Sequence, residues 1–284
     1  MSDIDNIIGD TPFIKLGEKL YAKLETYSPS GSIKDRMASY ILTKALHRGD
    51  LQGKDTIVVA SSGNTGIAFS MLSAAHGLKC IVVMPCNMSE ERKQMMRAYG
   101  ATIVEVGPSA FKDAISLRDK MLEENSSYWS PKQFSNPDNI ECHEKTTATE
   151  IAHRVLDMPA RLSALIAGAG TGGTIMGCQK QLSKLWKETK FILTMPQEDA
   201  ATHGIQGIND GADFLVDKDL IDEEILVSTE DAKQRASQLA KENGLLVGIS
   251  SGANVLAAER WIEKNNPTGV VVTFLCDRGE RYLS

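Results

Sequence analysis

Three stretches rich in glycine, serine and threonine stand where an apolar run gives way to a helical pattern. The longest, 167–174 (AGAGTGGT), follows the apolar run ALIA. Its glycines let backbone N–H groups approach an anion, and the positive end of the following helix favours negative charge. Thr171 and Thr174 add hydroxyl donors, so a phosphate is the natural occupant. Because the stretch has neither the Walker A lysine nor the dinucleotide spacing, a tightly packed glycine turn stays open as the alternative.

The second stretch, 60–66 (ASSGNTG), again lies between an apolar run and a helical pattern. Ser62, Asn64 and Thr65, together with neighbouring amides, form a pocket suited to a carboxylate, which accepts several hydrogen bonds and gains from the helix end. An ordinary helix cap uses the same residue types, and the two interpretations are evenly matched on the residues alone.

The third stretch, 30–36 (SGSIKDR), places Lys34 in the first turn of a helix. The helix dipole disfavours a cation there and lowers the pKa of an amine, which suits a nucleophilic or Schiff-base lysine. A solvated lysine in a first turn is the alternative. A phosphate cup, a carboxylate pocket and an activated amine together meet the needs of a pyridoxal-phosphate enzyme that handles an amino acid.

The elements that must position these residues alternate along the chain. Short apolar runs predict buried parallel strands at 56–60, 80–84, 102–106, 164–167, 191–195 and 270–275. Amphipathic stretches between them predict helices at 34–48, 64–76, 89–99, 109–123, 171–185 and 229–243. The fold class is therefore α/β, with sheets covered on both faces. The polar stretch 133–139 (QFSNPDN) is the best candidate for a passage between two lobes.

Composition excludes several classes of protein. The chain has 284 residues, 42% hydrophobic and 24% charged, which is typical of a folded globular protein. The net charge of -6 with interspersed signs argues against a nucleic-acid partner. The five scattered cysteines indicate reduced thiols and a cytoplasmic protein, and no apolar run is long enough to span a membrane. The five histidines lack metal-binding spacings, so no metal site is expected.

Read together and in order along the chain, eight segments resemble the O-acetylserine sulfhydrylases (cysteine synthases), which are fold-type II pyridoxal-phosphate enzymes, and are closest to the cysteine synthase B branch. They are GDTPFIKL, KLETYSPSGSIKDR, ASSGNTGIA, MPCNMSEERKQMMRAYGA, QFSNPDN, GAGTGGT, GLLVGISSGAN and CDRGERYLS. The resemblance implies two lobes, each a largely parallel twisted sheet flanked by helices, with the active site in the cleft between them. It implies a smaller mobile lobe at 35–140, and a larger lobe at 1–34 plus 141–284 that binds the cofactor phosphate.

The resemblance also implies roles for individual residues. Lys34 matches the lysine that forms the internal aldimine and later moves the α-proton, and Asn64 matches the residue beside the 3-hydroxyl of pyridoxal 5'-phosphate. The loop that closes on the substrate carboxylate corresponds to Ser61, Ser62, Gly63, Asn64 and Thr65. The phosphate cup corresponds to Gly170, Thr171, Gly172, Gly173 and Thr174.

Further positions complete the expected site. Gln133 matches a glutamine near the substrate carboxylate, and Gly207 is expected to contact substrate. The segment 203–207 (HGIQG) reads like the A branch, which puts the use of thiosulfate in doubt. Ser250 matches a serine that hydrogen-bonds the pyridine nitrogen, where a neutral hydroxyl favours β-elimination chemistry. Cys276 stands where it could line the pocket, although inert packing is the commoner role of a buried cysteine.

The implied reaction is a β-replacement that makes L-cysteine from O-acetyl-L-serine and sulfide through an α-aminoacrylate intermediate. The alternatives are a related enzyme, such as one of cystathionine β-synthase type, an O-phosphoserine-dependent enzyme or a cysteine desulfhydrase, and a regulatory paralogue without catalysis. The resemblance further suggests a homodimer, with serine acetyltransferase as a candidate partner.

Overall fold

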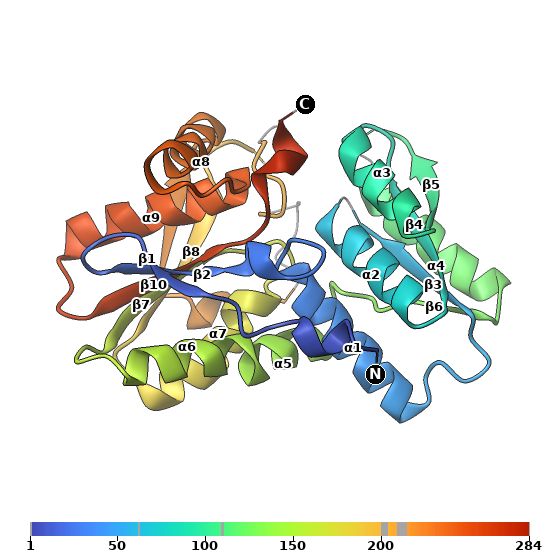
Figure 1. Cartoon of the computed structure of the whole chain (residues 1–284), viewed down its shortest axis with the longest axis horizontal. Coiled ribbons are helices and arrows are strands. Elements are labelled where there is room, and N and C mark those ends of the chain that lie inside the picture. Colours follow the sequence, from blue (N-terminus) through green and yellow to red (C-terminus); the bar gives the residue numbers. More distant parts are fainter. Residues whose placement is uncertain (1, 62, 109–110, 200–203, 209–214, 284) are drawn as a thin grey trace. The chain divides into compact units, whose positions relative to one another are not determined.

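The computed structural model describes residues 2–61, 63–108, 111–199, 204–208 and 215–283 (Figure 1). The chain divides into two compact units. The first comprises the described residues of Met1–Ile8 and Ser28–Asp138, and the second those of Gly9–Tyr27 and Asn139–Leu283. For comparison, the sequence predicts divisions after residues 34 and 140. The division after Asp138 falls within helix α5 (Pro137–Lys145).

The first unit is built on a four-stranded sheet in the order β5-β4-β3-β6, whose neighbouring strands are all parallel. The strands are β3 (Thr56–Ala60), β4 (Lys79–Pro85), β5 (Thr102–Val106) and β6 (Tyr128–Trp129). The helices are α1 (Lys34–Arg48), α2 (Asn64–Ala75), α3 (Glu90–Ala98) and α4 (Phe111–Glu124), and the short 3-10 helix η1 covers Asp5–Ile7.

Alternation along the strands of the first unit explains its layers. Ile57 and Val59 pack in the cluster that includes residues of α1, α2 and α3, whereas Val58 and Ala60 pack with α4. Because successive side chains of a strand point to opposite faces, a strand covered on both sides is buried throughout and mostly apolar, as β3 is, with Ile57, Val58, Val59 and Ala60 following Thr56.

The second unit is built on a six-stranded sheet in the order β1-β2-β10-β7-β8-β9. Its strands are β1 (Phe13–Lys15), β2 (Leu20–Leu24), β7 (Leu162–Gly168), β8 (Lys190–Pro196), β9 (Glu223–Val227) and β10 (Val270–Leu275). Only the pairing of β1 with β2 is antiparallel among these described strands. The helices are α5, α6 (Thr147–Leu156), α7 (Gly173–Leu185), α8 (Thr229–Asn243) and α9 (Ile249–Asn265), with 3-10 helices η2 (Glu25–Tyr27), η3 (Lys218–Leu220) and η4 (Gly279–Tyr282).

Helices cover both faces of the six-stranded sheet: Figure 1 shows α8 and α9 on one face and α6 and α7 on the other. Local signals set their ends. The Ser228 hydroxyl accepts a hydrogen bond from Asp231 N at 3.1 Å to begin α8, and Gly244 ends that helix with φ of 68°. The predicted α/β class, with parallel sheets flanked by helices, is confirmed. No helix in the described ranges combines the length and apolarity that crossing a bilayer requires.

Candidate active site

The candidate lysine stands at the very start of a helix in the first unit. Helix α1 begins at Lys34, as the sequence predicts. The preceding loop is fixed by the buried carboxylate of Asp35, which accepts hydrogen bonds from Ser30 N at 2.6 Å and from the Ser30 hydroxyl. Lys34 itself is half-buried, and within the described ranges its amine forms neither an ion pair nor a hydrogen bond. The fold therefore anchors the backbone around Lys34 and leaves its side chain available for chemistry.

The 60–66 loop connects the end of β3 to the start of α2 in the same unit. The buried Ser61 hydroxyl accepts hydrogen bonds from Gly63 N at 3.1 Å and Gly66 N at 3.0 Å. Ser61 therefore fixes the loop from within, the role expected of a cap, while Asn64 and Thr65 form the first turn of α2. The candidate Ser62 lies outside the described residues.

Gln133 reaches this loop from a distant part of the sequence. Thr65 Oγ1 donates to Gln133 Oε1 at 2.7 Å, and Gln133 Nε2 donates to the Ala60 carbonyl at 3.3 Å. Both side chains are buried. The structure thus brings Gln133 to the candidate carboxylate loop within the first unit.

In the second unit, the 169–172 loop joins β7 to α7. Gly172 has φ of 87°, in the left-handed region that favours glycine, and as the N-cap residue of α7 it brings no side chain of its own. Thr171 Oγ1 accepts a hydrogen bond from Gly173 N at 3.3 Å. Neighbours leave no room for side chains here. A Cβ on Gly170 would lie 2.6 Å from the Gly207 carbonyl oxygen, and one on Gly173 would lie 2.0 Å from Asn139 Oδ1. Bare glycine backbone at a helix N-terminus fits a phosphate group.

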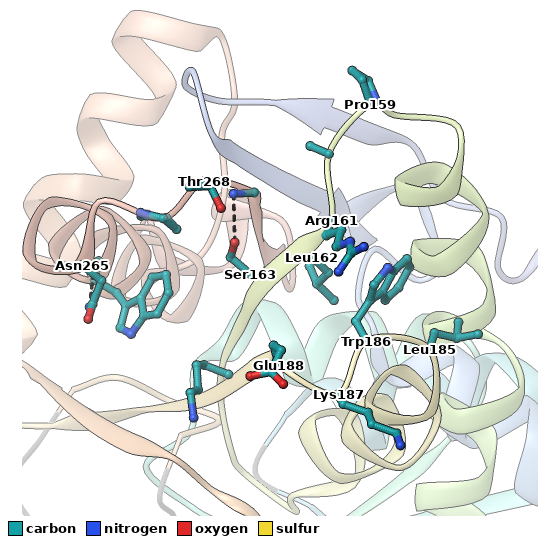
Figure 2. A pocket seen from close by; sticks show the side chains of 15 residues that line it. Pro159, Arg161, Leu162, Ser163, Leu185, Trp186, Lys187, Glu188, Asn265 and Thr268 are labelled. Atoms are coloured by element: carbon teal, nitrogen blue, oxygen red, sulfur yellow. Dashed lines mark hydrogen bonds between the residues drawn. The ribbon is translucent and has the colours of Figure 1, made fainter.

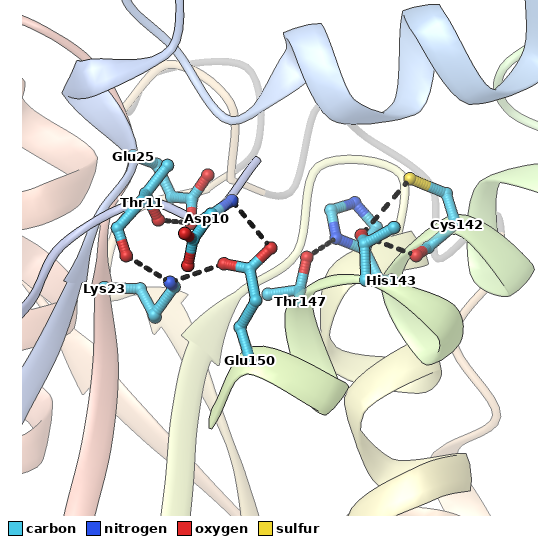
Figure 3. A network of polar contacts seen from close by, with 9 residues as sticks. Asp10, Thr11, Lys23, Glu25, Cys142, His143, Thr147 and Glu150 are labelled. Atoms are coloured by element: carbon cyan, nitrogen blue, oxygen red, sulfur yellow. Dashed lines mark hydrogen bonds and ion pairs between the residues drawn. The ribbon is translucent and has the colours of Figure 1, made fainter. Parts of the chain in front are cut away.

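Two further residues of this loop's surroundings were not singled out as site residues from the sequence. Buried Asn139 donates from Nδ2 to Thr171 Oγ1 at 2.9 Å, and buried His143 places Nε2 3.2 Å from Thr174 Oγ1. The other ring nitrogen of His143 lies 2.9 Å from Thr147 Oγ1 (Figure 3). Asn139 and His143 are four residues apart, so one face of α5 presents both. That spacing is the signal that could have found them.

Asn254 ties together the other cofactor candidates of the second unit. Its Oδ1 accepts from Gly168 N at 2.8 Å at the end of β7, while its Nδ2 donates to the Phe274 carbonyl at 3.2 Å and lies 3.4 Å from Cys276 Sγ. Cys276 is half-buried, and its N–H donates to the Ser251 hydroxyl at 2.9 Å. The 170–174 loop and Cys276 therefore share the carboxyl edge of the sheet, the edge at which α/β proteins bind ligands.

Ser250 lies beside this linkage, in the first turn of α9. Its side chain is buried, and its hydroxyl has no hydrogen-bond partner in the part of the chain that the structure describes. A hydroxyl in this state suits a ligand atom that the protein itself does not supply. Gly207, with φ of 86°, packs its carbonyl beneath Gly170.

A cavity of about 1050 Å³ lies elsewhere in the second unit (Figure 2). It is lined at the amino ends of β7, β8 and β10 by residues that include Leu162, Lys190 and Gly269. None of the candidate residues lines it, and it faces the sheet edge opposite to that of Cys276. We therefore do not assign it to the candidate site.

Comparison with known proteins gives one family for the whole chain. The model of the family described as "Pyridoxal-phosphate dependent enzyme" matches residues 4–277. The cysteine synthase of Staphylococcus aureus is 38% identical over 302 residues, covering 100% of this chain and 96% of that protein. A probable cysteine synthase of Bacillus subtilis is 38% identical over 298 residues, covering 98% and 95%.

Solved structures agree with the sequence relatives. A hydrogen sulfide-producing enzyme of Fusobacterium nucleatum superposes with a TM-score of 0.93 at 37% identity, covering 99% of this chain and 89% of that chain. An O-acetylserine dependent cystathionine β-synthase of Helicobacter pylori gives 0.90 at 34% identity, covering 100% and 97%. The resemblance read from the motifs is confirmed, and pyridoxal phosphate is the cofactor. The chain belongs to the family of pyridoxal-phosphate dependent enzymes.

Proposed function

We propose that this protein is a cysteine synthase, which replaces the acetate of O-acetyl-L-serine with sulfide to give L-cysteine. The observation that carries the proposal is the state of Lys34, the first residue of α1, whose amine has no protein partner within the described ranges. The chain around it matches the family of pyridoxal-phosphate dependent enzymes from residue 4 to 277. The names of the Staphylococcus aureus and Bacillus subtilis relatives support the choice of reaction.

The residues divide the work by their chemistry. Bound pyridoxal phosphate supplies an electron sink for negative charge at the substrate Cα. Lys34 Nζ is the attachment point of the cofactor and the base that takes the proton from Cα and later returns it. Backbone N–H groups of 170–174 hold the phosphate. The Ser250 hydroxyl serves the ring nitrogen as a neutral partner.

The 61–65 loop and Gln133 bind the substrate carboxylate in this proposal. The N-terminus of α2 favours the negative charge, and the Thr65–Gln133 hydrogen bond gives the loop a fixed partner. Asn64 is assigned to the 3-hydroxyl of the cofactor and Gly207 to the substrate, while Cys276 lines the pocket. Ser62 is assigned to the same carboxylate loop.

Steady-state turnover tests the proposal. Wild type and Lys34→Ala are assayed with O-acetyl-L-serine, O-phospho-L-serine and L-serine, each paired with sulfide and with thiosulfate, and L-cysteine is measured. Wild type is expected to prefer O-acetyl-L-serine with sulfide, and Lys34→Ala to lose about 10³-fold in kcat, the scale of a lost general base. Preferential use of another serine derivative would contradict the choice of substrate, and full activity of Lys34→Ala would contradict the mechanism.

Release of sulfide from L-cysteine is the second candidate reaction. The solved structure with a TM-score of 0.93 belongs to a hydrogen sulfide-producing enzyme, which favours including this reaction in the test. The same preparation is therefore given L-cysteine alone, and sulfide is measured. A kcat/KM for sulfide release above that for cysteine formation would make this the main activity.

We also propose that the protein works in the cytoplasm as a homodimer and that serine acetyltransferase is a partner. Free thiols at all five cysteines support a reducing compartment. The family resemblance supports the dimer and the partner. Light scattering after size exclusion, with and without a serine acetyltransferase, tests both assemblies. A monomeric mass would contradict the homodimer, and an unchanged mass on addition of the acetyltransferase would contradict the partner.

A further inference from the structure

A residue with an unfavourable backbone conformation stands directly before Gln133 in the first unit. Lys132 has φ of 46°, in the left-handed region that a residue other than glycine seldom adopts. Its side chain is exposed and, within the described ranges, forms neither a hydrogen bond nor an ion pair. What Lys132 contributes to the fold therefore lies in its backbone.

Hydrogen bonds on both sides of Lys132 hold this conformation. The Lys132 carbonyl accepts from Ser135 N and from Asn136 N, each at 3.0 Å. The carbonyl of Pro131, on the other side, accepts from Asn136 Nδ2 at 2.9 Å, and Asn136 Oδ1 accepts from Asp138 N at 2.9 Å. A strained backbone persists only where its surroundings over-determine it, and such residues cluster at functional sites.

The turn that Lys132 begins determines where Gln133 lies. Gln133 is 4% exposed, and its side chain contacts the 60–66 loop at two places. Its Oε1 accepts from Thr65 Oγ1 at 2.7 Å, and its Nε2 donates to the Ala60 carbonyl at 3.3 Å. With the negative φ that most residues prefer, the chain would leave Lys132 in another direction, and Gln133 would lie where these bonds could not form.

We infer that Lys132 is a positioning residue, whose left-handed backbone places Gln133 against the 60–66 loop and so keeps that loop in the form that receives the substrate carboxylate. The inference rests on the proposed function, in which this loop and Gln133 bind the carboxylate of an amino-acid substrate. It adds a residue that acts through Gln133 and by its backbone alone, with no part for its own charge.

The test varies the backbone preference at position 132 while the loss of charge stays constant. Holoenzyme of wild type, Lys132→Asn and Lys132→Val is assayed with O-acetyl-L-serine, and sulfide is held in excess. Both substitutions remove the ammonium group, but asparagine tolerates the left-handed region and β-branched valine does not. Asn266→Val is the matched control, because Asn266 ends α9 in the second unit with φ of 41°. Urea midpoints of all the proteins measure stability separately.

Lys132→Val is expected to raise KM for O-acetyl-L-serine about tenfold, with kcat changed less than threefold, because the empty loop relaxes and substrate binding must restore it. Lys132→Asn is expected to stay within twofold of wild type. Gln133→Ala should raise KM by itself, and adding Lys132→Val to it should change KM less than twofold further. Asn266→Val is expected to lower the urea midpoint and to leave KM within twofold of wild type.

Three outcomes of the kinetics overturn the inference. The first is a wild-type KM in Lys132→Val. The second is an equal loss in Lys132→Asn, which would assign the effect to the side chain. The third is an undiminished loss when Gln133 is already alanine, which would mean that position 132 acts without Gln133. Should Lys132→Val fail to fold, Lys132→Thr replaces it with the same expected results.

A measurement that needs no turnover separates this inference from the proposed function. Hydrogen exchange of the amides of Gly63 and Gly66, both bonded to the Ser61 hydroxyl, is followed in the holoenzymes without substrate. Lys132→Val is expected to speed this exchange, and Lys132→Asn and Asn266→Val are not. Should wild type neither bind nor turn over O-acetyl-L-serine, the proposed function fails, and the exchange alone decides whether Lys132 holds the loop. Equal exchange in all the variants would then overturn the inference.

Discussion

A buried ion pair in the second unit is predicted to contribute to the free energy of unfolding, and mutagenesis can measure that contribution. Lys23, near the end of β2, is 1% exposed, and its amine lies 2.6 Å from both Glu150 Oε2 and the Thr11 carbonyl oxygen. Glu150, on α6, also accepts from Asp10 N at 3.0 Å (Figure 3). The pair thus joins β2, α6 and the segment at residues 10–11.

The expected magnitude follows from what each substitution leaves behind. In Glu150→Ala, the Lys23 ammonium keeps one neutral carbonyl while fully buried, so the free energy of unfolding should fall by about 3 kcal/mol. In Lys23→Met, the carboxylate left behind is 18% exposed and still bonded to Asp10 N, so the loss should be about 1–2 kcal/mol. The double variant Lys23→Met/Glu150→Gln removes both charges of the pair and should lose no more than Lys23→Met alone.

Tryptophan fluorescence can follow the unit concerned. Trp186 and Trp261 belong to the second unit and Trp129 to the first, so a Trp129→Phe background confines the signal to the second unit. Urea unfolding of the apoprotein is then compared across the variants. Lys190→Met is the control, because Lys190 pairs with Asp222 at 2.8 Å in the same unit but is 55% exposed, and exposed pairs contribute less than about 1 kcal/mol.

The reasoning predicts an order as well as a size. Glu150→Ala must be the most destabilised variant and Lys190→Met the least. Equal urea midpoints for Glu150→Ala and Lys190→Met would show that burial of the charge has no effect. A double variant whose loss equals the summed losses of Lys23→Met and Glu150→Gln, each measured alone, would show that the two side chains are not coupled.

Two further predictions concern the phosphate loop and the thiols. Gly173→Ala should weaken the binding of pyridoxal phosphate to the apoprotein at least about tenfold in a fluorescence titration, because the new Cβ would collide with Asn139. Gly17→Ala is the control and should leave the affinity unchanged, because its Cβ would lie 3.6 Å from the nearest neighbouring atom. Equal affinities of the two variants would contradict the assignment of the 170–174 loop to the phosphate. Burial raises the pKa of the Cys80 thiol from 9.0 to about 11. The folded protein therefore keeps a proton that the unfolded chain releases, so stability should fall as pH rises from 9 to 11. At pH 8 a thiol reagent should label exposed Cys86 and reach Cys80 only in urea, since two pKa units lower its thiolate fraction about 100-fold; labelling of Cys80 in the native protein would contradict this.

Much of the fold could be predicted because its strands are buried on both faces and its helices are amphipathic. Helices α1 and α8 and strands β3, β5 and β10 have the bounds that the sequence predicts. Helix α9 was missed because its first turns read as a loop of small residues. Packing explains them, since a Cβ on Gly252 would lie 2.1 Å from the Ala232 carbonyl oxygen of α8, and close contact overrides low helix propensity.

Strand β2 was missed for a different reason. Its run LYAKL is broken by Lys23, which reads as exposed until its partner is known, and that partner lies 127 residues away in sequence. A buried charge depends on a distant residue, and no local pattern reveals such a residue.

In the candidate site, too, the features set by local sequence could be predicted and those set by contacts between distant segments could not. Local patterns predicted the loops at 60–66 and 167–174 and the place of Lys34 at a helix start, because strand ends and helix starts leave a signature of glycine, serine and threonine. Contacts between distant segments left no such signature. The bond from Asn139 to Thr171 is one example, and the approach of Arg92 to Gly63 is another.

The hydrogen bonds of Asn254 determine how the carboxyl edge of the six-stranded sheet responds to substitutions near the ends of β7 and β10. The single amide group of Asn254 connects the ends of two neighbouring strands: the oxygen accepts a hydrogen bond from Gly168 N in β7, and the nitrogen donates one to the Phe274 carbonyl in β10. The segments that follow β7 and β10 are thus both positioned by the side chain of Asn254. A shift of either strand therefore changes the hydrogen bond that Asn254 forms with the other strand. Sequence changes after β7 and after β10 are therefore coupled, and pairs of substitutions there should evolve together rather than singly.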